Sequence, residues 1–180
     1  EAGRGRFRGV RFASTWHADP EARGSVLNHP AGILYEPAVR LGLAELERRG
    51  LVFDAWMYHT QLADLVDLAH DMPGLTIVIN HLGGPLCIGP YANRREDVFE
   101  YWRFMMGRLA CFPNVHVKLG GFGMLMSGFD FHERPRPPSS EALAAAWGTY
   151  MRPCIDLFSP ARCMFESNFP VDKGVSSYKV

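Results

Sequence analysis

The chain of 180 residues is long enough for one globular domain with a sizeable apolar core, and its hydrophobic share of 47% is typical of that class. Acidic and basic residues balance at 19 each, so no overall charge favours nucleic acid or an anionic membrane. No apolar run reaches the roughly 20 residues needed to cross a bilayer, and the polar opening EAGRGRFRG lacks the apolar segment of a signal peptide. We therefore expect a cytoplasmic protein that acts on a small molecule, with no nucleic-acid or membrane partner. Assembly into a homo-oligomer stays open.

The cysteines are widely spaced and include no C-x-x-C pair, which argues against a zinc knuckle and against a disulfide framework. They are Cys87, Cys111, Cys154 and Cys163. We interpret all of them as reduced side chains that contribute to packing.

Apolar strand patterns alternate with amphipathic helix patterns along the chain. The predicted elements, in chain order, are a strand at 7–14, a helix at 36–49, a strand at 51–59, a helix at 60–71, a strand at 75–81, a helix at 94–111, a strand at 115–121, a helix at 140–158 and a strand at 162–169. In the second helix Leu62, Leu65, Val66 and Ala69 recur at helical spacing, and Thr60 is a suitable N-cap.

This alternation predicts an α/β fold with parallel strands, because each helix must carry the chain back across the sheet. A (β/α)₈ TIM barrel has eight strands and typically needs about 250 residues. The five strand patterns found here therefore predict an incomplete barrel that lacks about three βα units. The sequence begins without methionine, close to a strand. We expect residues 1–180 to be one partial barrel domain, the C-terminal portion, with the first strands missing.

Polar side chains follow the carboxyl ends of the predicted strands, where a parallel α/β fold gathers its active site. His59 follows the second strand, His81 ends the third, and Lys118 lies late in the fourth. By strand alternation, His116 and Lys118 point into the barrel. These strand ends are expected to deliver their polar groups to one face.

The end of the fifth strand carries Glu166, Asn168 and Asp172. Alternation along a continued strand would place Glu166 and Asn168 on the same face. A buried ion pair between Lys118 and Glu166 is the structural alternative to a catalytic role for either residue.

His81 is the strongest single candidate. It shares its strand parity with Ile77 and Ile79, and the Leu-Gly-Gly-Pro that follows it has little side-chain bulk, so a ligand can approach the backbone closely. For His59 the sequence favours a functional role and a structural role equally. Arg11, on the first strand, is the best local anion clamp, since a guanidinium binds a carboxylate through two parallel hydrogen bonds.

Motifs of several other enzyme classes are absent from the sequence. No G-x-S-x-G elbow of a serine hydrolase occurs. The stretch GGFGMLMSG has neither dinucleotide-binding nor Walker spacing. HERPR lacks the second histidine of a helical zinc-protease motif, and its prolines forbid the helix.

GVR near the start, followed in order by TIVINHLGGP, VHVKLGGF and MFESNFPVD, resembles the amidohydrolase-related group of metal-dependent TIM-barrel hydrolases. That group includes sugar lactonases, 2-pyrone-4,6-dicarboxylate lactonase and aminocarboxymuconate semialdehyde decarboxylase. The resemblance covers nearly the whole chain. The order and spacing of the short motifs carry it more than any one of them.

The resemblance implies roles for three residues. His81 matches the strand-end histidine of the group's DHLG motif, a metal ligand or an acid/base residue. Asn168 stands where the group's GSDFP motif has an aspartate that binds metal or activates water, and an amide cannot act as a general base. Asp172 is a substitute with different geometry, because it lies beyond Pro170. The group's H-x-H pair would lie upstream of this chain.

The resulting hypothesis is hydrolysis of a small lactone or related cyclic ester, carboxylated or sugar-derived, by an activated water. The predicted catalytic residues are His81, Asn168 and Asp172, and the predicted substrate-binding residues are Arg11, His59, Lys118 and Glu166. His81 is also the predicted metal ligand, with zinc or manganese as an optional cofactor. Activity is expected of the parent protein and not of this chain alone. Two alternatives stay open: non-oxidative decarboxylation, and a non-catalytic barrel relative in which Asn168 marks a lost aspartate.

Overall fold

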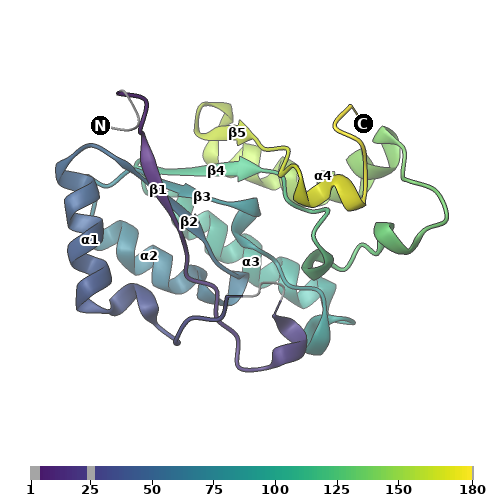
Figure 1. Cartoon of the computed structure of the whole chain (residues 1–180), viewed down its shortest axis with the longest axis horizontal. Coiled ribbons are helices and arrows are strands. Elements are labelled where there is room, and N and C mark those ends of the chain that lie inside the picture. The colour runs from purple at the N-terminus through teal and green to yellow at the C-terminus, as the bar shows by residue number, and fades with distance from the viewer. Residues whose placement is uncertain (1–4, 24–26, 180) are drawn as a thin grey trace.

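The computed structural model describes residues 5–23 and 27–179. Its centre is a parallel sheet whose strands lie in chain order, each paired with the next (Figure 1). The strands are β1 (Gly9–Ala13), β2 (Val52–Trp56), β3 (Ile77–Ile79), β4 (Val115–Leu119) and β5 (Cys163–Phe165). Consecutive parallel pairing is the arrangement of neighbouring strands in a (β/α)₈ barrel. The predicted α/β class is therefore confirmed.

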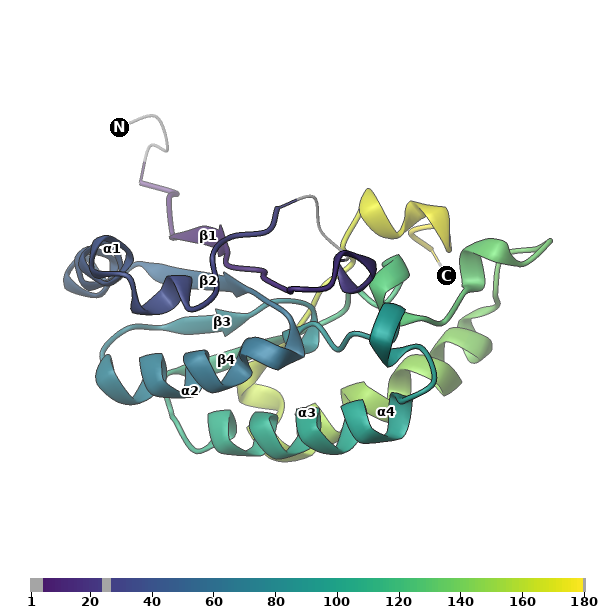
Figure 2. The same cartoon turned by 90° about the horizontal axis from the view of Figure 1, so that it is seen from below.

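The connecting helices are α1 (Pro37–Arg48), α2 (Leu62–Asp71), α3 (Arg95–Ala110) and α4 (Ser140–Phe158). Figure 2 shows α2, α3 and α4 along one face of the sheet, and each packs against its neighbour. Helix α1 begins with Pro37, whose missing N–H costs nothing in a first turn. Helix α4 begins after Ser139, whose hydroxyl accepts a hydrogen bond from the N–H of Ala142.

The apolar core lies between this helix layer and the sheet. It takes alternate strand residues, which are Phe53, Ala55, Ile77, Ile79, Val115 and Val117, all fully buried. The residues between them point to the opposite face of the sheet. Sequence alternation therefore predicted correctly which face of β4 meets the helices and that Lys118 lies on the other face.

Element boundaries differ from the predictions mainly at the ends of strands. A 3₁₀ turn, His59–Gln61, precedes α2, so the helix begins later than predicted and Thr60 is not its N-cap. The third strand ends at Ile79 and the fifth at Phe165, so both strands are shorter than predicted. The polar residues that follow these strands are held by turns, and strand alternation does not apply to them.

The β5 edge of the sheet carries exposed apolar side chains. Phe165 is 80% exposed, and Met164, Val171 and Tyr178 near it are also exposed. In the part of the chain that is described, no strand pairs with the outer side of β5 or of β1. Both outer edges thus have the character expected of a barrel segment whose neighbouring strands lie elsewhere.

The four cysteines are free in the structure. Cys87 and Cys154 are buried, Cys163 is partly buried, and Cys111 is exposed. The interpretation of all cysteines as packing residues is therefore wrong for Cys111, which is the exposed C-cap of α3.

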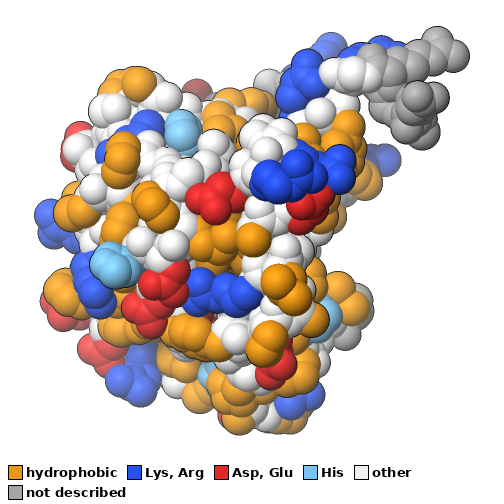
Figure 3. Space-filling view, turned by 90° about the vertical axis from the view of Figure 1, so that its left-hand side faces the viewer, with side chains coloured by type: hydrophobic (Ala, Val, Ile, Leu, Met, Phe, Trp, Pro, Cys, Tyr) orange, Lys and Arg blue, Asp and Glu red, His pale blue; other side chains and the backbone are white. Residues whose placement is uncertain are grey.

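The surface carries interspersed charges. Figure 3 shows one face, on which Lys and Arg side chains alternate with Asp and Glu and with hydrophobic side chains. On α1, Glu45 forms an ion pair with Arg48 and another with Arg49. No helix in residues 5–23 and 27–179 is long and apolar enough to cross a membrane.

Candidate active site

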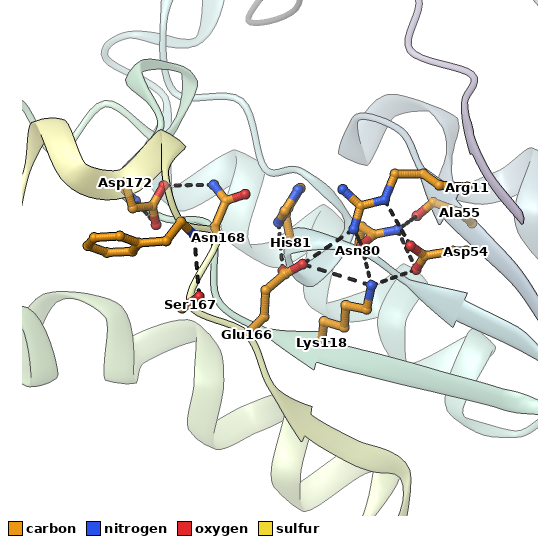
Figure 4. A network of polar contacts seen from close by, with 12 residues as sticks. Arg11, Asp54, Ala55, Asn80, His81, Lys118, Glu166, Ser167, Asn168 and Asp172 are labelled. Atoms are coloured by element: carbon orange, nitrogen blue, oxygen red, sulfur yellow. Dashed lines mark hydrogen bonds and ion pairs between the residues drawn. The ribbon is translucent and has the colours of Figure 1, made fainter. Parts of the chain in front are cut away.

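Side chains from all five strands meet on the sheet face opposite the helices (Figure 4). Arg11 comes from β1, Asp54 from β2 and Lys118 from β4. Asn80 follows β3 directly, and Glu166 follows β5 directly. We call this set the polar cluster. Lys118, Asn80 and Glu166 lie at the carboxyl ends of their strands, where parallel α/β folds place their active sites, and Arg11 and Asp54 reach them from the middle of β1 and β2.

Asp54 is the anionic centre of the polar cluster. Its Oδ2 lies 2.8 Å from Nε of Arg11, and its Oδ1 lies 2.8 Å from Nζ of Lys118. Burial raises the pKa of Asp54, but the hydrogen bonds and positive charges of Lys118 and Arg11 outweigh burial, and the net pKa is lowered. Asp54 is therefore ionised at neutral pH.

Asn80 ties the same groups together and is fully buried. Its Oδ1 accepts hydrogen bonds from Nη2 of Arg11 at 2.6 Å and from Nζ of Lys118 at 2.9 Å. Its Nδ2 donates to Oδ1 of Asp54 at 2.7 Å. Both cations are thereby fixed in direction, since the carboxylate and the amide together satisfy them.

Sequence reasoning missed Asp54 and Asn80. Asp54 was detectable, because it is the one charged residue of an otherwise apolar strand and stands directly opposite Arg11 in the β1–β2 register. Arg11 donates a hydrogen bond from Nε to Asp54 and another from Nη2 to Asn80. These two donors are already engaged within the chain, and the role of Arg11 as an anion clamp stays a prediction.

His81 and Glu166 form the closest contact between residues predicted to act in the site. Nδ1 of His81 lies 2.6 Å from Oε2 of Glu166, and both side chains are mostly buried. The other oxygen of Glu166, Oε1, lies 3.6 Å from Nη2 of Arg11 and 3.9 Å from Nζ of Lys118. The expected Lys118–Glu166 pair is thus a secondary contact, and the main ionic partner of Lys118 is Asp54.

A turn sets the direction of the His81 side chain. Continued alternation would have pointed His81 toward the helices with Ile77 and Ile79, and that prediction is wrong. The strand ends first, and His81 and Leu82 both have positive φ angles, 50° and 52°. Gly121, at φ 83°, lies so close to the imidazole that a Cβ there would collide with the ring.

The second nitrogen of His81 is available. In the described residues Nε2 has no hydrogen-bond partner, and it is not one of the polar atoms sealed from solvent. The Trp56 ring meets the imidazole edge-on, with 4.7 Å between ring centroids. His81 is therefore held on one side and reachable on the other.

Asn168 and Asp172 form a second pair beside the first. Asn168, at φ 51°, donates from Nδ2 to Oδ1 of Asp172 at 2.7 Å, and the N–H of Gly123 donates to Oδ2 at 3.2 Å. Burial raises the pKa of Asp172 more than these hydrogen bonds and the nearby His81 lower it, and Glu166 raises it further. Asn168 thus faces Asp172 and makes no hydrogen bond to Glu166, so the shared face predicted for Asn168 and Glu166 does not become a shared contact.

His59 lies outside the polar cluster. It is buried, and its Nδ1 accepts a hydrogen bond from the N–H of Leu86 at 3.2 Å. Its ring meets those of Tyr91 and Tyr101 edge-on. The structure therefore brings six of the seven predicted site residues into two adjacent groups and leaves His59 in a separate pocket.

Comparison with known proteins identifies the family. The protein-family model whose description is amidohydrolase matches residues 1–179. The chain belongs to the amidohydrolase family. Uncharacterized protein y4mH of Sinorhizobium fredii is 38% identical over 172 residues, which are 96% of this chain and 50% of that protein. L-fucono-1,5-lactonase of Burkholderia ambifaria is 32% identical over 168 residues, which are 93% of this chain and 48% of that protein.

Solved amidohydrolase structures share the fold. A zinc-bound amidohydrolase of Burkholderia multivorans superposes with a TM-score of 0.72 at 23% identity, over 96% of this chain and 53% of that one. A HEPES-bound form superposes with a TM-score of 0.75 at 24% identity, over 99% and 56%. The chain spans about half the length of the relatives that it matches. The five-stranded sheet is accordingly part of an amidohydrolase barrel, as the sequence predicted.

The amidohydrolase family implies a bound metal ion, but the described residues alone do not form a site that would hold one. Zinc and manganese are held by several nitrogen and oxygen ligands at once. No group of three His, Cys, Asp or Glu side chains in residues 5–23 and 27–179 is arranged to hold an ion. Nδ1 of His81 and both oxygens of Asp172 already have hydrogen-bond partners within the chain.

A cavity of about 470 Å³ opens beside the paired groups. Glu166 and Asp172 line it, together with Gly121 and the exposed Phe165 and Tyr178. This volume is within the usual range for small-molecule sites. Of the residues of the candidate site, Glu166 and Asp172 line this cavity, whereas His81, Arg11 and Lys118 do not.

Proposed function

We propose that the protein to which this chain belongs hydrolyses a small lactone, with His81 as its acid/base residue. The observation that carries the proposal is the arrangement of the imidazole between Glu166 and the open side of the site. A carboxylate that accepts a hydrogen bond from Nδ1 keeps the proton on that nitrogen, so the lone pair of neutral His81 lies on Nε2. Nε2 is the atom that has no partner in the described chain.

The chemistry follows from that tautomer. A water attacks the lactone carbonyl carbon, and Nε2 of His81 takes the proton that the water loses. The ring C–O bond then breaks, and the protonated imidazole returns its proton to the departing alkoxide. The product is the open-chain hydroxy acid. Glu166 stabilises the positive charge that His81 carries between the two steps.

The cations of the polar cluster suit the charge that develops on the substrate. Lys118 and Arg11 both lie beside Glu166, and Arg11 remains partly exposed. Asp54 and Asn80 fix their direction, which gives electrostatic stabilisation without reorganisation during the reaction. In this proposal Arg11 and Lys118 act chiefly as a fixed positive field.

Relatives support a lactone as the substrate class. Two relatives are named L-fucono-1,5-lactonase, one from Burkholderia ambifaria and one from Burkholderia multivorans. A fold neighbour from Pseudomonas putida is described as a 2-pyrone-4,6-dicarboxylic acid hydrolase, at a TM-score of 0.51. Zinc or manganese stays an optional cofactor, on the precedent of the zinc-bound neighbour, and no step above depends on it.

The direct test is an assay of the full-length protein with sugar 1,5-lactones, including L-fucono-1,5-lactone, and with 2-pyrone-4,6-dicarboxylate. A pH-stat follows the acid released, and headspace analysis follows carbon dioxide. Acid release without carbon dioxide supports the proposal. Carbon dioxide release from a carboxylated substrate would favour the decarboxylase alternative, and turnover of no substrate would favour the non-catalytic one.

A further inference from the structure

A second cavity, of about 350 Å³, lies where the turn after β2 meets the amino end of α3. Its polar and aromatic lining residues are His59, Thr60, Tyr91, Arg94, Asp97 and Tyr101. It shares no lining residue with the cavity beside Glu166. The proposed hydrolysis uses none of these residues.

His59 presents a hydrogen-bond donor to this cavity. Its Nδ1 accepts from the N–H of Leu86, so the neutral ring carries its proton on Nε2. Burial, and then the charge of His17, lower the pKa of His59 to about 4 against the opposing effect of the Gly84 carbonyl, so the ring is neutral at pH 7. Apart from the Leu86 N–H and the Gly84 carbonyl, the ring has no hydrogen-bond partner in residues 5–23 and 27–179. Nε2 is not sealed from solvent, although only 3% of the residue is exposed.

Thr60 adds a second unsatisfied group at the cavity wall. Its hydroxyl is sealed and has no hydrogen-bond partner in the described structure. Buried polar groups are rarely left unpaired, because an unpaired one has lost its hydrogen bonds to water without replacement. A rotation about χ1 turns such a hydroxyl, and a ligand oxygen in the cavity would then satisfy it.

The remaining walls are aromatic and electrically balanced. The rings of Tyr91 and Tyr101 lie 5.1 Å and 6.2 Å from the His59 ring, between centroids. His17 holds the Tyr91 hydroxyl in place through a 3.1 Å hydrogen bond from its Nε2. Nε of Arg94 lies 2.9 Å from Oδ2 of Asp97, so the two charges at the rim cancel.

We propose that this cavity is a second binding site, and that its ligand is a neutral, polyhydroxylated ring of monosaccharide size. The balanced Arg94–Asp97 pair offers donors and acceptors without favouring a charged ligand. His59 and Thr60 offer hydrogen bonds at depth, and the tyrosine rings offer apolar surface to the C–H face of a sugar. The volume lies at the lower end of the range for ligand pockets, which suits a single ring.

The test uses methyl glycosides of glucose, galactose, mannose and fucose, none of which contains a lactone. Binding to the full-length protein is followed by saturation-transfer NMR and calorimetry. His59→Asn retains an acceptor for the Leu86 N–H and removes the Nε2 donor, whereas His59→Gln retains a donor near Nε2. We expect at least about tenfold weaker binding for the Asn variant and a smaller loss for the Gln variant, because a buried neutral hydrogen bond is lost only in the first.

Tyr101→Ala has a matched control in Phe104→Ala, which removes an exposed aromatic ring of the same helix outside the cavity. Only Tyr101→Ala should weaken binding, and Glu166→Gln should leave it unchanged. Thermal unfolding checks that each variant is folded, and Thr60→Val provides a near-isosteric second probe if His59→Asn unfolds. Absence of binding by every glycoside overturns the proposal. Equal glycoside affinity of His59→Asn and the wild type also overturns it. Loss of glycoside binding in Glu166→Gln does the same, and so does tighter binding of benzoate than of the glycosides.

Discussion

Nδ1 of His81 and Oε2 of Glu166 lie 2.6 Å apart although 85 residues separate them in the chain. The two residues follow β3 and β5, so the contact passes over the end of the intervening β4. It requires that both strands end early, at Ile79 and Phe165. The distance between His81 and Glu166 therefore depends on where β3, β4 and β5 end.

Glu166→Gln should lower kcat for lactone hydrolysis by about tenfold to hundredfold, the scale found when an orienting partner is lost. The amide has the same shape, but it neither holds the His81 tautomer as firmly nor stabilises the imidazolium. Steady-state kinetics of the full-length protein measure the effect, which should fall on kcat more than on KM. Glu133→Gln, at an exposed position in the 3₁₀ turn Phe131–Glu133, is the matched control and should have wild-type kinetics. Equal kcat for the Glu166 variant and the wild type would mean that the contact is only structural.

Asn168→Asp should increase the affinity of the full-length protein for divalent metal. The substitution places a second carboxylate against Asp172, where Asn168 now donates a hydrogen bond. Two adjacent buried carboxylates repel each other unless a cation or a proton lies between them. Calorimetric titration with zinc and with manganese compares the variant with the wild type. Identical affinity would place residue 168 outside any metal pocket of the complete protein.

The sequence predicted most of the fold, and fewer details of the site. Helix and strand patterns located the elements because burial on one helix face or strand face leaves a regular apolar period. Alternation also placed Lys118 correctly. It failed for His81, because the positive φ angle there belongs to a turn that no apolar period records. It missed Asn80 because a buried amide has no signature until its three partners are brought together in space.

His59 should make stability depend on pH between about 6.5 and about 4. Its pKa is lowered from 6.5 to about 4 on folding, so the folded state favours the neutral ring. That stability is present above pH 6.5 and is lost as the pH falls toward 4, by about 3 kcal/mol at most. Urea unfolding at a series of pH values measures the slope. His59→Asn should reduce the slope in this window, and an unchanged slope would contradict the burial argument.

Residues 1–180 expressed alone should self-associate and lack lactonase activity. The β5 edge exposes Phe165 and Met164, and backbone groups at the outer edges of β1 and β5 have no strand partner in the described residues. Such edges pair readily with other chains. Size-exclusion chromatography with light scattering tests the prediction. A soluble monomer that unfolds cooperatively and hydrolyses lactones would show that this chain is a complete domain.

The catalytic role of His81 is decided by kcat/KM for a sugar 1,5-lactone, compared between the full-length wild type and His81→Ala at matched thermal stability. We expect measurable hydrolysis by the wild type and a loss of at least about tenfold to hundredfold in the variant, the usual effect of removing a positioned acid/base group. His116→Ala, on the neighbouring strand, controls for the loss of a histidine as such. Undiminished hydrolysis by a folded His81→Ala protein would remove His81 from the mechanism.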